Sequence, residues 1–186
     1  MKSSYDCVVI GAGPAGGSAA SITAEAGLKT LLIERERVPR FHVGESLMPE
    51  TYWPLQRLGL TDQCHPRRAG DRCFSMLPAS SKGGGALFEE LCRGEFNKML
   101  FDRAGELGAD CYDETRLSDV RFDESGKATG VVVRDRDGNT HEITSKVVID
   151  ATGQQSFIAN KLRLKEVNQD LKKAAIWGYH RDAVRG

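Results

Sequence analysis

The sequence has no net charge: 26 lysine and arginine residues balance 26 aspartate and glutamate residues in a chain of 186. Without an excess of positive charge, the composition does not favour a nucleic-acid partner or adsorption to an anionic membrane. No apolar run approaches the ~20 residues that a membrane-spanning helix needs. We therefore expect no nucleic-acid partner, no membrane span and a cytoplasmic location.

Cysteine and histidine are present, but not in the spacings of a structural site. The five cysteines are odd in number, widely separated and include no C-x-x-C pair, so they indicate neither a disulfide framework nor a zinc site. The four histidines have no metal-binding spacing either. We accordingly predict no metal site among Cys7, Cys64, Cys73, Cys92, Cys111, His42, His65, His141 and His180.

The most informative feature that is present is a glycine-rich turn. Residues 11–16 read Gly-Ala-Gly-Pro-Ala-Gly, follow the apolar run Cys7–Ile10 and open an alanine-rich stretch. A second apolar run, Leu31–Ile33, ends at Glu34, which stands 18 residues after the last glycine of the turn. A strand, this triplet of glycines, a helix and an acid about 20 residues further on form the dinucleotide-binding arrangement.

Each residue of this arrangement has a physical role. Gly11 allows a tight turn off the strand, Gly13 leaves room for a pyrophosphate against the backbone, and Gly16 allows close packing of helix on sheet. Pro14 suits the first helical turn, whose free N–H groups attract phosphate. Glu34 would accept hydrogen bonds from ribose hydroxyls. The alternative is a glycine-rich turn without a ligand, followed by an ordinary surface glutamate.

The rest of the chain predicts an α/β protein. A loop over residues 35–49 leads into a helix from Glu50 to Leu58, and a poorly patterned stretch precedes an amphipathic helix from Glu95 to Leu107. Short strands are predicted over residues 117–122, 131–134 and 140–144, and a further buried strand, residues 146–149, delivers Asp150 at its carboxyl end.

Several motifs occur in a characteristic order: Gly-Ala-Gly-Pro-Ala-Gly at 11–16, Glu34-Arg35, Gly44-Glu-Ser-Leu-Met-Pro49, Arg93-Gly-Glu-Phe96, a three-strand meander, and Asp150-Ala-Thr-Gly153. Together they resemble the flavin-dependent monooxygenase superfamily. The Gly-Glu-Ser-Leu-Met-Pro loop is similar to that of its halogenase and geranylgeranyl reductase branch. The resemblance covers nearly the whole chain.

This resemblance implies a Rossmann-like FAD-binding domain with a parallel sheet and a three-stranded β-meander, and FAD rather than free NAD as the cofactor. The glycine turn would hold the pyrophosphate, the acid the adenosine ribose, the arginines the phosphate and ribitol, and the 44–46 loop would lie by the flavin ring. The cofactor-binding residues implied are Gly11, Ala12, Gly13, Pro14, Ala15, Gly16, Glu34, Arg35, Gly44, Glu45, Ser46, Arg93, Asp150 and Gly153.

The resemblance also implies a domain organisation. The FAD-binding domain would cover residues 1–165, with residues 66–92 reaching toward the substrate side. Residues 166–186 would only begin a second, substrate-binding domain. Enzymes of this superfamily build their substrate pocket on later segments, so we expect the chain to be a fragment of a longer enzyme.

The implied activity is that of an FAD-dependent oxidoreductase. Reduced FAD would react with oxygen to give a flavin hydroperoxide, which oxygenates or halogenates a small organic substrate. A separate flavin reductase is a candidate partner, and no catalytic residue is assigned. Three alternatives stay open: a truncated, non-catalytic flavin-binding remnant, a geranylgeranyl reductase-like enzyme that reduces double bonds, and an NAD-linked dehydrogenase, which leaves the 44–46 loop unexplained.

Overall fold

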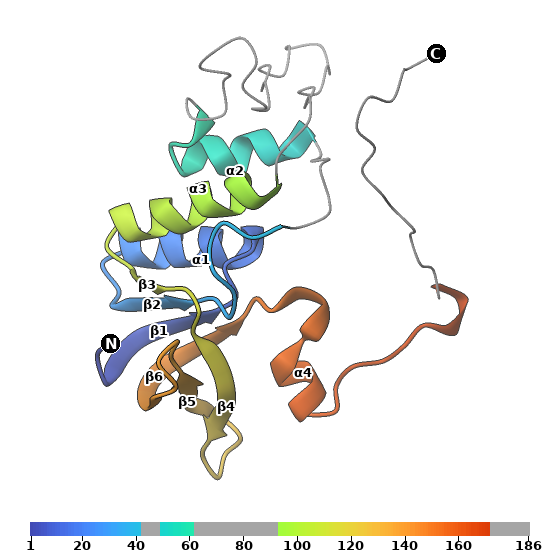
Figure 1. Ribbon diagram of the computed structural model, residues 1–186. Helices are drawn as coiled ribbons and strands as arrows, with labels where there is room; N and C mark the ends of the chain where they lie inside the picture. Colours follow the sequence, from blue (N-terminus) through green and yellow to red (C-terminus); the bar gives the residue numbers. More distant parts are fainter. Residues whose placement is uncertain (42–48, 62–92, 172–186) are drawn as a thin grey trace.

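The computed structural model describes residues 1–41, 49–61 and 93–171 (Figure 1). In chain order its elements are β1 (Ser4–Ile10), α1 (Pro14–Glu25), β2 (Thr30–Ile33), η1 (Pro49–Thr51), α2 (Tyr52–Arg57), α3 (Arg93–Glu106), β3 (Asp110–Tyr112), β4 (Arg116–Phe122), β5 (Ala128–Arg134), β6 (Thr140–Asp150), η3 (Gly153–Gln155), α4 (Phe157–Lys161) and η4 (Gln169–Leu171).

The described strands form one six-stranded sheet in the order β3-β2-β1-β6-β5-β4. β1 pairs in parallel with both β2 and β6, and β2 pairs in parallel with β3. The other half is antiparallel, because β5 pairs with β4 on one side and with β6 on the other. The prediction of an α/β fold with a parallel sheet and a three-stranded meander is confirmed.

One continuous strand, β6, joins the two halves of this sheet. Its first half pairs with β5 and its second half, from Thr144 to Asp150, pairs with β1. The sequence predicted two strands here, residues 140–144 and 146–149, because polar residues interrupt the apolar pattern. In the structure the Ser145 hydroxyl donates to the carbonyl of Val147 at 2.5 Å, so its polar group is satisfied and the strand continues.

The three-residue strand β3 was not predicted. It reads Asp-Cys-Tyr and is too short to show the alternation of side chains on which strand prediction depends. It lies at the edge of the sheet, where its pairing with Leu31, Leu32 and Ile33 of β2 defines it. Tertiary contact rather than local pattern therefore makes this strand.

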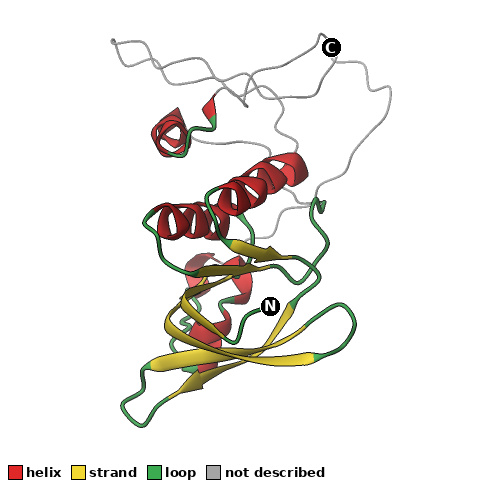
Figure 2. Cartoon of the chain, turned by 90° about the vertical axis from the view of Figure 1, so that its left-hand side faces the viewer, coloured by secondary structure: helices red, strands yellow, loops and turns green. Residues whose placement is uncertain are grey.

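Two apolar layers hold the sheet, because successive side chains of a strand point to opposite faces. On one face Cys7, Val9 and Leu32 pack against alanines of α1 and α3. On the other face Val8 and Leu31 belong to a second cluster, whose meander residues are Val120, Val131, Val133 and Ile143. The helices α1 and α3 thus cover one face of the parallel strands and the meander the other (Figures 1 and 2).

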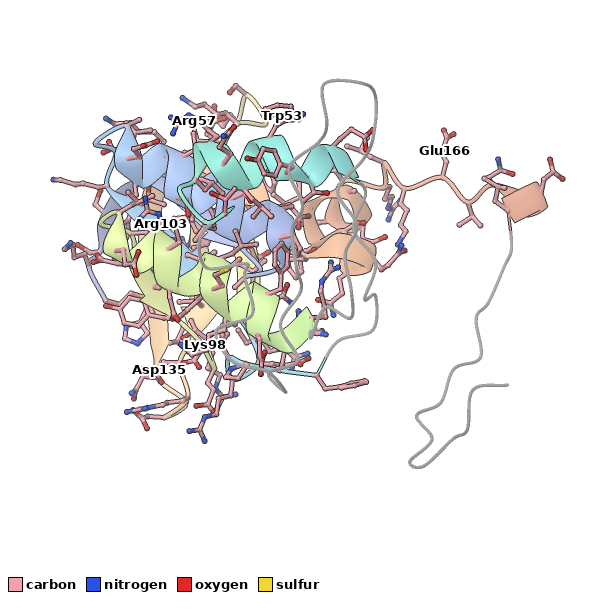
Figure 3. All side chains as sticks on the ribbon, turned by 90° about the horizontal axis from the view of Figure 1, so that it is seen from above. Trp53, Arg57, Lys98, Arg103, Asp135 and Glu166 are labelled. Carbon is pink, nitrogen blue, oxygen red and sulfur yellow. The ribbon has the colours of Figure 1, made fainter. Side chains whose placement is uncertain are left out.

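A third apolar cluster places α2 on α3. It consists of Leu55, Leu58, Leu60, Phe96 and Leu100, all buried. Polar contacts fasten the same layer: Arg57 pairs with Glu25 at 2.7 Å, and Arg103 Nε donates to the carbonyl of Leu58 at 2.8 Å (Figure 3). α3 is therefore held between α2 and α1. None of the described helices is long and apolar enough to cross a membrane.

Candidate functional site

The parallel strands all end on the same side of the sheet, and backbone hydrogen bonds join the loops that follow their carboxyl ends. The Gly11 N–H donates to the carbonyl of Ile33 at 2.8 Å, and the Ala151 N–H donates to that of Ile10 at 2.9 Å. The Glu34 N–H likewise donates to the carbonyl of Tyr112 at 2.9 Å. These loops thus form a single hydrogen-bonded rim, which includes the glycine turn and Glu34.

Two of the three motif glycines are required by the fold itself. Gly11 has φ +99°, which favours glycine, and an added Cβ would lie 2.6 Å from the carbonyl oxygen of Ala151. At Gly16 an added Cβ would lie only 1.7 Å from the carbonyl oxygen of Gly11. These glycines allow the strand, the turn and the helix to approach one another closely.

Gly13 differs from its neighbours. Its φ of −74° and ψ of −177° are extended backbone that any residue adopts, and an added Cβ would meet no heavy atom of the described residues within 4 Å. Neither its conformation nor packing among the described residues therefore calls for a glycine here. The open space beside Gly13 is a cradle that a Cβ would fill, as a ligand against the backbone requires.

Gly13 is also the N-cap of α1, and Pro14 occupies the first turn as predicted. No side chain caps this helix, and its first turn contains no acidic residue. The N–H groups of such a turn and the positive end of the helix dipole attract an anion. Ala12 is buried and Ala15 exposed, so the turn presents backbone rather than side chains.

Glu34 is almost fully buried, with 3% of its surface exposed. Its Oε2 accepts a hydrogen bond of 2.9 Å from the N–H of Ala12, and its Oε1 accepts one of 3.2 Å from the N–H of Glu36. The carboxylate is therefore a brace between the end of β2 and the glycine turn. Sequence reasoning anticipated its position, but not this contact with the chain's own backbone.

The arginine that lies beside Glu34 is not the predicted Arg35. Arg35 pairs with Glu36 at 3.2 Å on the surface, and 41% of its side chain is exposed. Arg40 instead lies 3.6 Å from Glu34, with 20% of its side chain exposed. Sequence reasoning missed Arg40, because it lies in a loop without periodicity; the only available signal was a basic residue a few positions after a buried acid.

Arg93 begins α3 close to the same rim. The residue is half-buried, its Nε is buried, and desolvation by burial lowers the pKa of its guanidinium. The next residue, Gly94, allows close packing, because an added Cβ there would lie 2.6 Å from the carbonyl oxygen of Arg40. The start of α3 is thereby held against the loop that follows β2.

Asp150 and Gly153 form the other side of the rim. Asp150 Oδ1 accepts hydrogen bonds from the N–H and the hydroxyl of Thr152 at 3.0 and 2.6 Å, and Oδ2 accepts one from the N–H of Ile158 at 2.7 Å. This carboxylate thus shapes the turn after β6 and the start of α4. Gly153, exposed and with φ +62°, completes that turn.

The structure brings together residues 11–16, Glu34, Arg93, Asp150 and Gly153 at one edge of the sheet, with Arg35 on its outer surface. The predicted residues Gly44, Glu45 and Ser46 lie outside the described residues. No group of three or more His, Cys, Asp or Glu that could hold a metal occurs within the described ranges. A polar cavity of about 300 Å³ lies elsewhere, near the start of β1, and is lined by Ser4, Tyr5, Asp6, Lys29, Thr129, Thr144, Ser145 and Lys146.

Comparison with known proteins identifies the family of this chain. The model of the FAD binding domain family matches residues 4–184, nearly the whole chain. The chain belongs to this family. FAD, the cofactor that the motifs implied, is therefore confirmed.

Relatives of this FAD binding domain include halogenases, in agreement with the resemblance. The 1H-pyrrole-2-carbonyl-[peptidyl-carrier protein] chlorinase of Pseudomonas fluorescens is 32% identical, and the alignment covers 92% of this chain and 44% of that protein. The structure of the myxobacterial chondrochloren halogenase CndH matches with a TM-score of 0.71 and 30% identity, over 83% of this chain and 38% of that one.

A second kind of relative is a geranylgeranyl bacteriochlorophyll reductase-like protein from Thermoplasma acidophilum. Its structure matches with a TM-score of 0.60 and 28% identity, over 80% of this chain and 39% of that one. The predicted resemblance to both halogenases and geranylgeranyl reductases is confirmed. The chain spans about two fifths of the length of the curated relatives that it matches.

Proposed function

We propose that this chain is the FAD-holding part of an FAD-dependent oxidoreductase of the monooxygenase and halogenase type. The observation that carries the proposal is the cradle at Gly13. A glycine that neither backbone conformation nor packing requires stands at the uncapped start of α1, on the rim where the parallel strands end. A diphosphate that lies against this backbone would occupy the space that glycine, without a side chain, leaves free.

Each residue of the rim has a part in this proposal. Gly11 and Gly16 keep the turn compact. Gly13 and Ala15 would offer N–H groups to the diphosphate, because the Ala12 N–H already donates to Glu34 and Pro14 has no N–H. Glu34 offers the lone pairs that its two backbone hydrogen bonds leave free to the ribose hydroxyls. Arg93 contributes positive charge at the start of α3.

The remaining predicted contacts lie on the other walls of the site. Asp150 and Gly153 shape the wall on the adenosine side, and residues 44–46 remain proposed neighbours of the flavin ring. Arg35 is the weakest of the predicted contacts, because its observed partner is Glu36 on the surface. Arg40 forms an ion pair with the buried Glu34 and so influences the site through that residue.

When bound, FAD supplies the electron transfer and oxygen chemistry, and the protein supplies placement. Oxygenation or halogenation of a small organic substrate is the activity that we propose for the whole enzyme. The names of the relatives support both parts: one chlorinates a pyrrole-2-carbonyl group on a peptidyl-carrier protein, and another is a chondrochloren halogenase. A carrier-bound acyl group is therefore a candidate substrate beside a free small molecule.

Reduction of double bonds is the second candidate, favoured by the match to the geranylgeranyl reductase-like structure. A non-catalytic flavin-binding remnant is the third. We further propose an FAD-binding domain over residues 1–165, a separate flavin reductase as partner and a cytoplasmic location. The described cysteines, Cys7 and Cys111, are free thiols, as a reducing compartment favours.

The test is a binding experiment with the purified chain. It should retain a yellow flavin after gel filtration with FAD, at one equivalent per chain, and should bind FMN much more weakly because FMN lacks the adenosine that the rim would hold. Equal retention of FMN would contradict the assignment of Glu34. Failure to bind either flavin would contradict the proposed function.

A further inference from the structure

The fold does not explain why one polar residue of α3 is buried. Asn97 is buried, with 3% of its surface exposed, and neither its Nδ2 nor its Oδ1 has a hydrogen-bond partner among the described residues. Buried polar side chains nearly always have such partners, because an unmatched group keeps its full desolvation cost. Two unmatched atoms on one side chain therefore call for a partner that the described residues do not supply.

The position of Asn97 on α3 indicates where that partner lies. Residues three, four and seven positions further along the helix share its face. These are Leu100, Phe101 and Ala104, of which Ala104 is buried in the core between the sheet and α1, and Phe101 packs against the same core. Asn97 therefore continues the face of α3 that points toward α1 and the sheet.

The register between the two helices places Asn97 beside the first turn of α1. α1 and α3 both lead into strands of the parallel sheet, so they run side by side in the same direction (Figure 1). Gly17 and Leu100 touch, because a Cβ added to Gly17 would lie 2.7 Å from Leu100 Cβ. One helical turn back from this contact, toward both N-termini, stand Gly13 and Asn97.

We propose that Asn97 is a further dinucleotide-binding residue, whose Nδ2 donates a hydrogen bond to the diphosphate. This inference rests on the proposed function. A carboxamide offers two N–H donors to phosphate oxygens and an acceptor, Oδ1, to a neighbouring hydroxyl. It adds these without a second charge beside Arg93, which begins the same helix one turn earlier.

The inference predicts opposite effects on the free and the liganded protein. Asn97→Leu removes two unmatched polar atoms with little change in size, so the ligand-free chain should melt about 2–4 °C or more higher. The same substitution removes a hydrogen bond to an anion, so affinity should fall by about tenfold to a hundredfold. The loss should be equal for FAD and ADP-ribose, which share the diphosphate, as measured by titration calorimetry.

Two further variants complete the experiment. Asn97→Asp keeps the shape, loses the donors and adds a negative charge, so it should weaken FAD more than Asn97→Leu does; it also serves if the leucine variant does not fold. Lys98→Gln is the matched control, because Lys98 is exposed on the neighbouring position and pairs with Asp102 (Figure 3). This control should bind FAD as the unaltered chain does.

The outcomes separate the inference from the proposed function. If the unaltered chain binds neither FAD nor ADP-ribose, the proposed function fails. If it binds both and the Asn97 variants bind equally well, only the inference is overturned. A lower melting temperature of ligand-free Asn97→Leu would also overturn it, since the partner would then lie within the chain, and so would a loss confined to FAD.

Discussion

Gly13→Val should separate ligand binding from folding. Valine adopts the observed backbone at this position without strain, and its Cβ enters open space. As an N-cap, valine is worse than glycine by up to about 1 kcal/mol. Replacing glycine also restricts the unfolded chain, which stabilises by about 0.4–1 kcal/mol. These effects nearly cancel, so the melting temperature should stay within about 4 °C.

Binding of FAD by Gly13→Val should collapse in spite of this stability. The branched side chain would occupy the space in which the diphosphate lies against the backbone. We expect an affinity loss of at least about a hundredfold, equivalent to about 2.7 kcal/mol. Fluorescence titration of FAD, together with thermal unfolding of the ligand-free chain, measures the two effects on the same sample.

Two other glycines calibrate this experiment. Gly16→Ala should lose more than about 3 kcal/mol of folding stability, because its Cβ would lie 1.7 Å from a backbone oxygen that cannot move away. Gly105→Ala lies on an exposed position of α3, 3.9 Å from the sulfur of Cys111, and should gain about 0.5–1 kcal/mol without affecting FAD. Unchanged FAD affinity in Gly13→Val would refute the cradle, and unfolding of that variant would refute the claim that the fold does not need this glycine.

Three further predictions concern the charged groups. Glu34→Ala should lower the free energy of unfolding by about 1–3 kcal/mol in urea, because the buried N–H of Ala12 loses its acceptor, whereas Glu34→Gln should lose less; equal losses would contradict the bracing role. Arg40→Ala should cost roughly 1–3 kcal/mol, between the values for exposed and buried ion pairs, and Arg35→Ala under about 1 kcal/mol; the reverse order in urea unfolding would be inconsistent with the observed pairing. The hydrogen bond from His141 holds the pKa of Asp135 at about 2, below its usual 3.8, so the stabilisation from the ionised carboxylate is complete above pH ~4 and is lost as the pH falls toward 2. Asp135→Asn should flatten the dependence of the free energy of unfolding on pH in that window, and an unaltered pH profile would exclude this contribution.

Periodicity and turn chemistry predicted much of this fold from the sequence. The strand before the glycine turn, the helix after it and the amphipathic helix from Glu95 to Leu107 all occur, because each has a strong local pattern. The helix begins at Arg93, two residues earlier than predicted. β3 and the continuity of β6 were missed, since the pairing of distant strands decides both.

The sequence predicted where several candidate residues lie in the fold, but not which groups they contact. Spacing located Glu34, because an acid at the end of the second strand is part of a known arrangement. Spacing could not distinguish Arg35 from Arg40 as its neighbour, because the path of an irregular loop decides which guanidinium approaches a buried carboxylate. No pattern in the sequence indicated the unmatched amide of Asn97, since burial and missing partners are properties of the packed molecule.

The contacts also show which residue best distinguishes a flavin-binding protein from one that has lost its ligand. Glu34 and Asp150 accept hydrogen bonds from the chain's own backbone, and Gly11 and Gly16 are required by close packing. A chain that had lost its ligand would still keep these four for stability. Gly13 has no such role, and a residue such as serine or asparagine there would cap α1 better. A chain that no longer bound a dinucleotide would therefore be free to replace Gly13 at a gain in stability, and the glycine retained here is what continued binding of a diphosphate predicts.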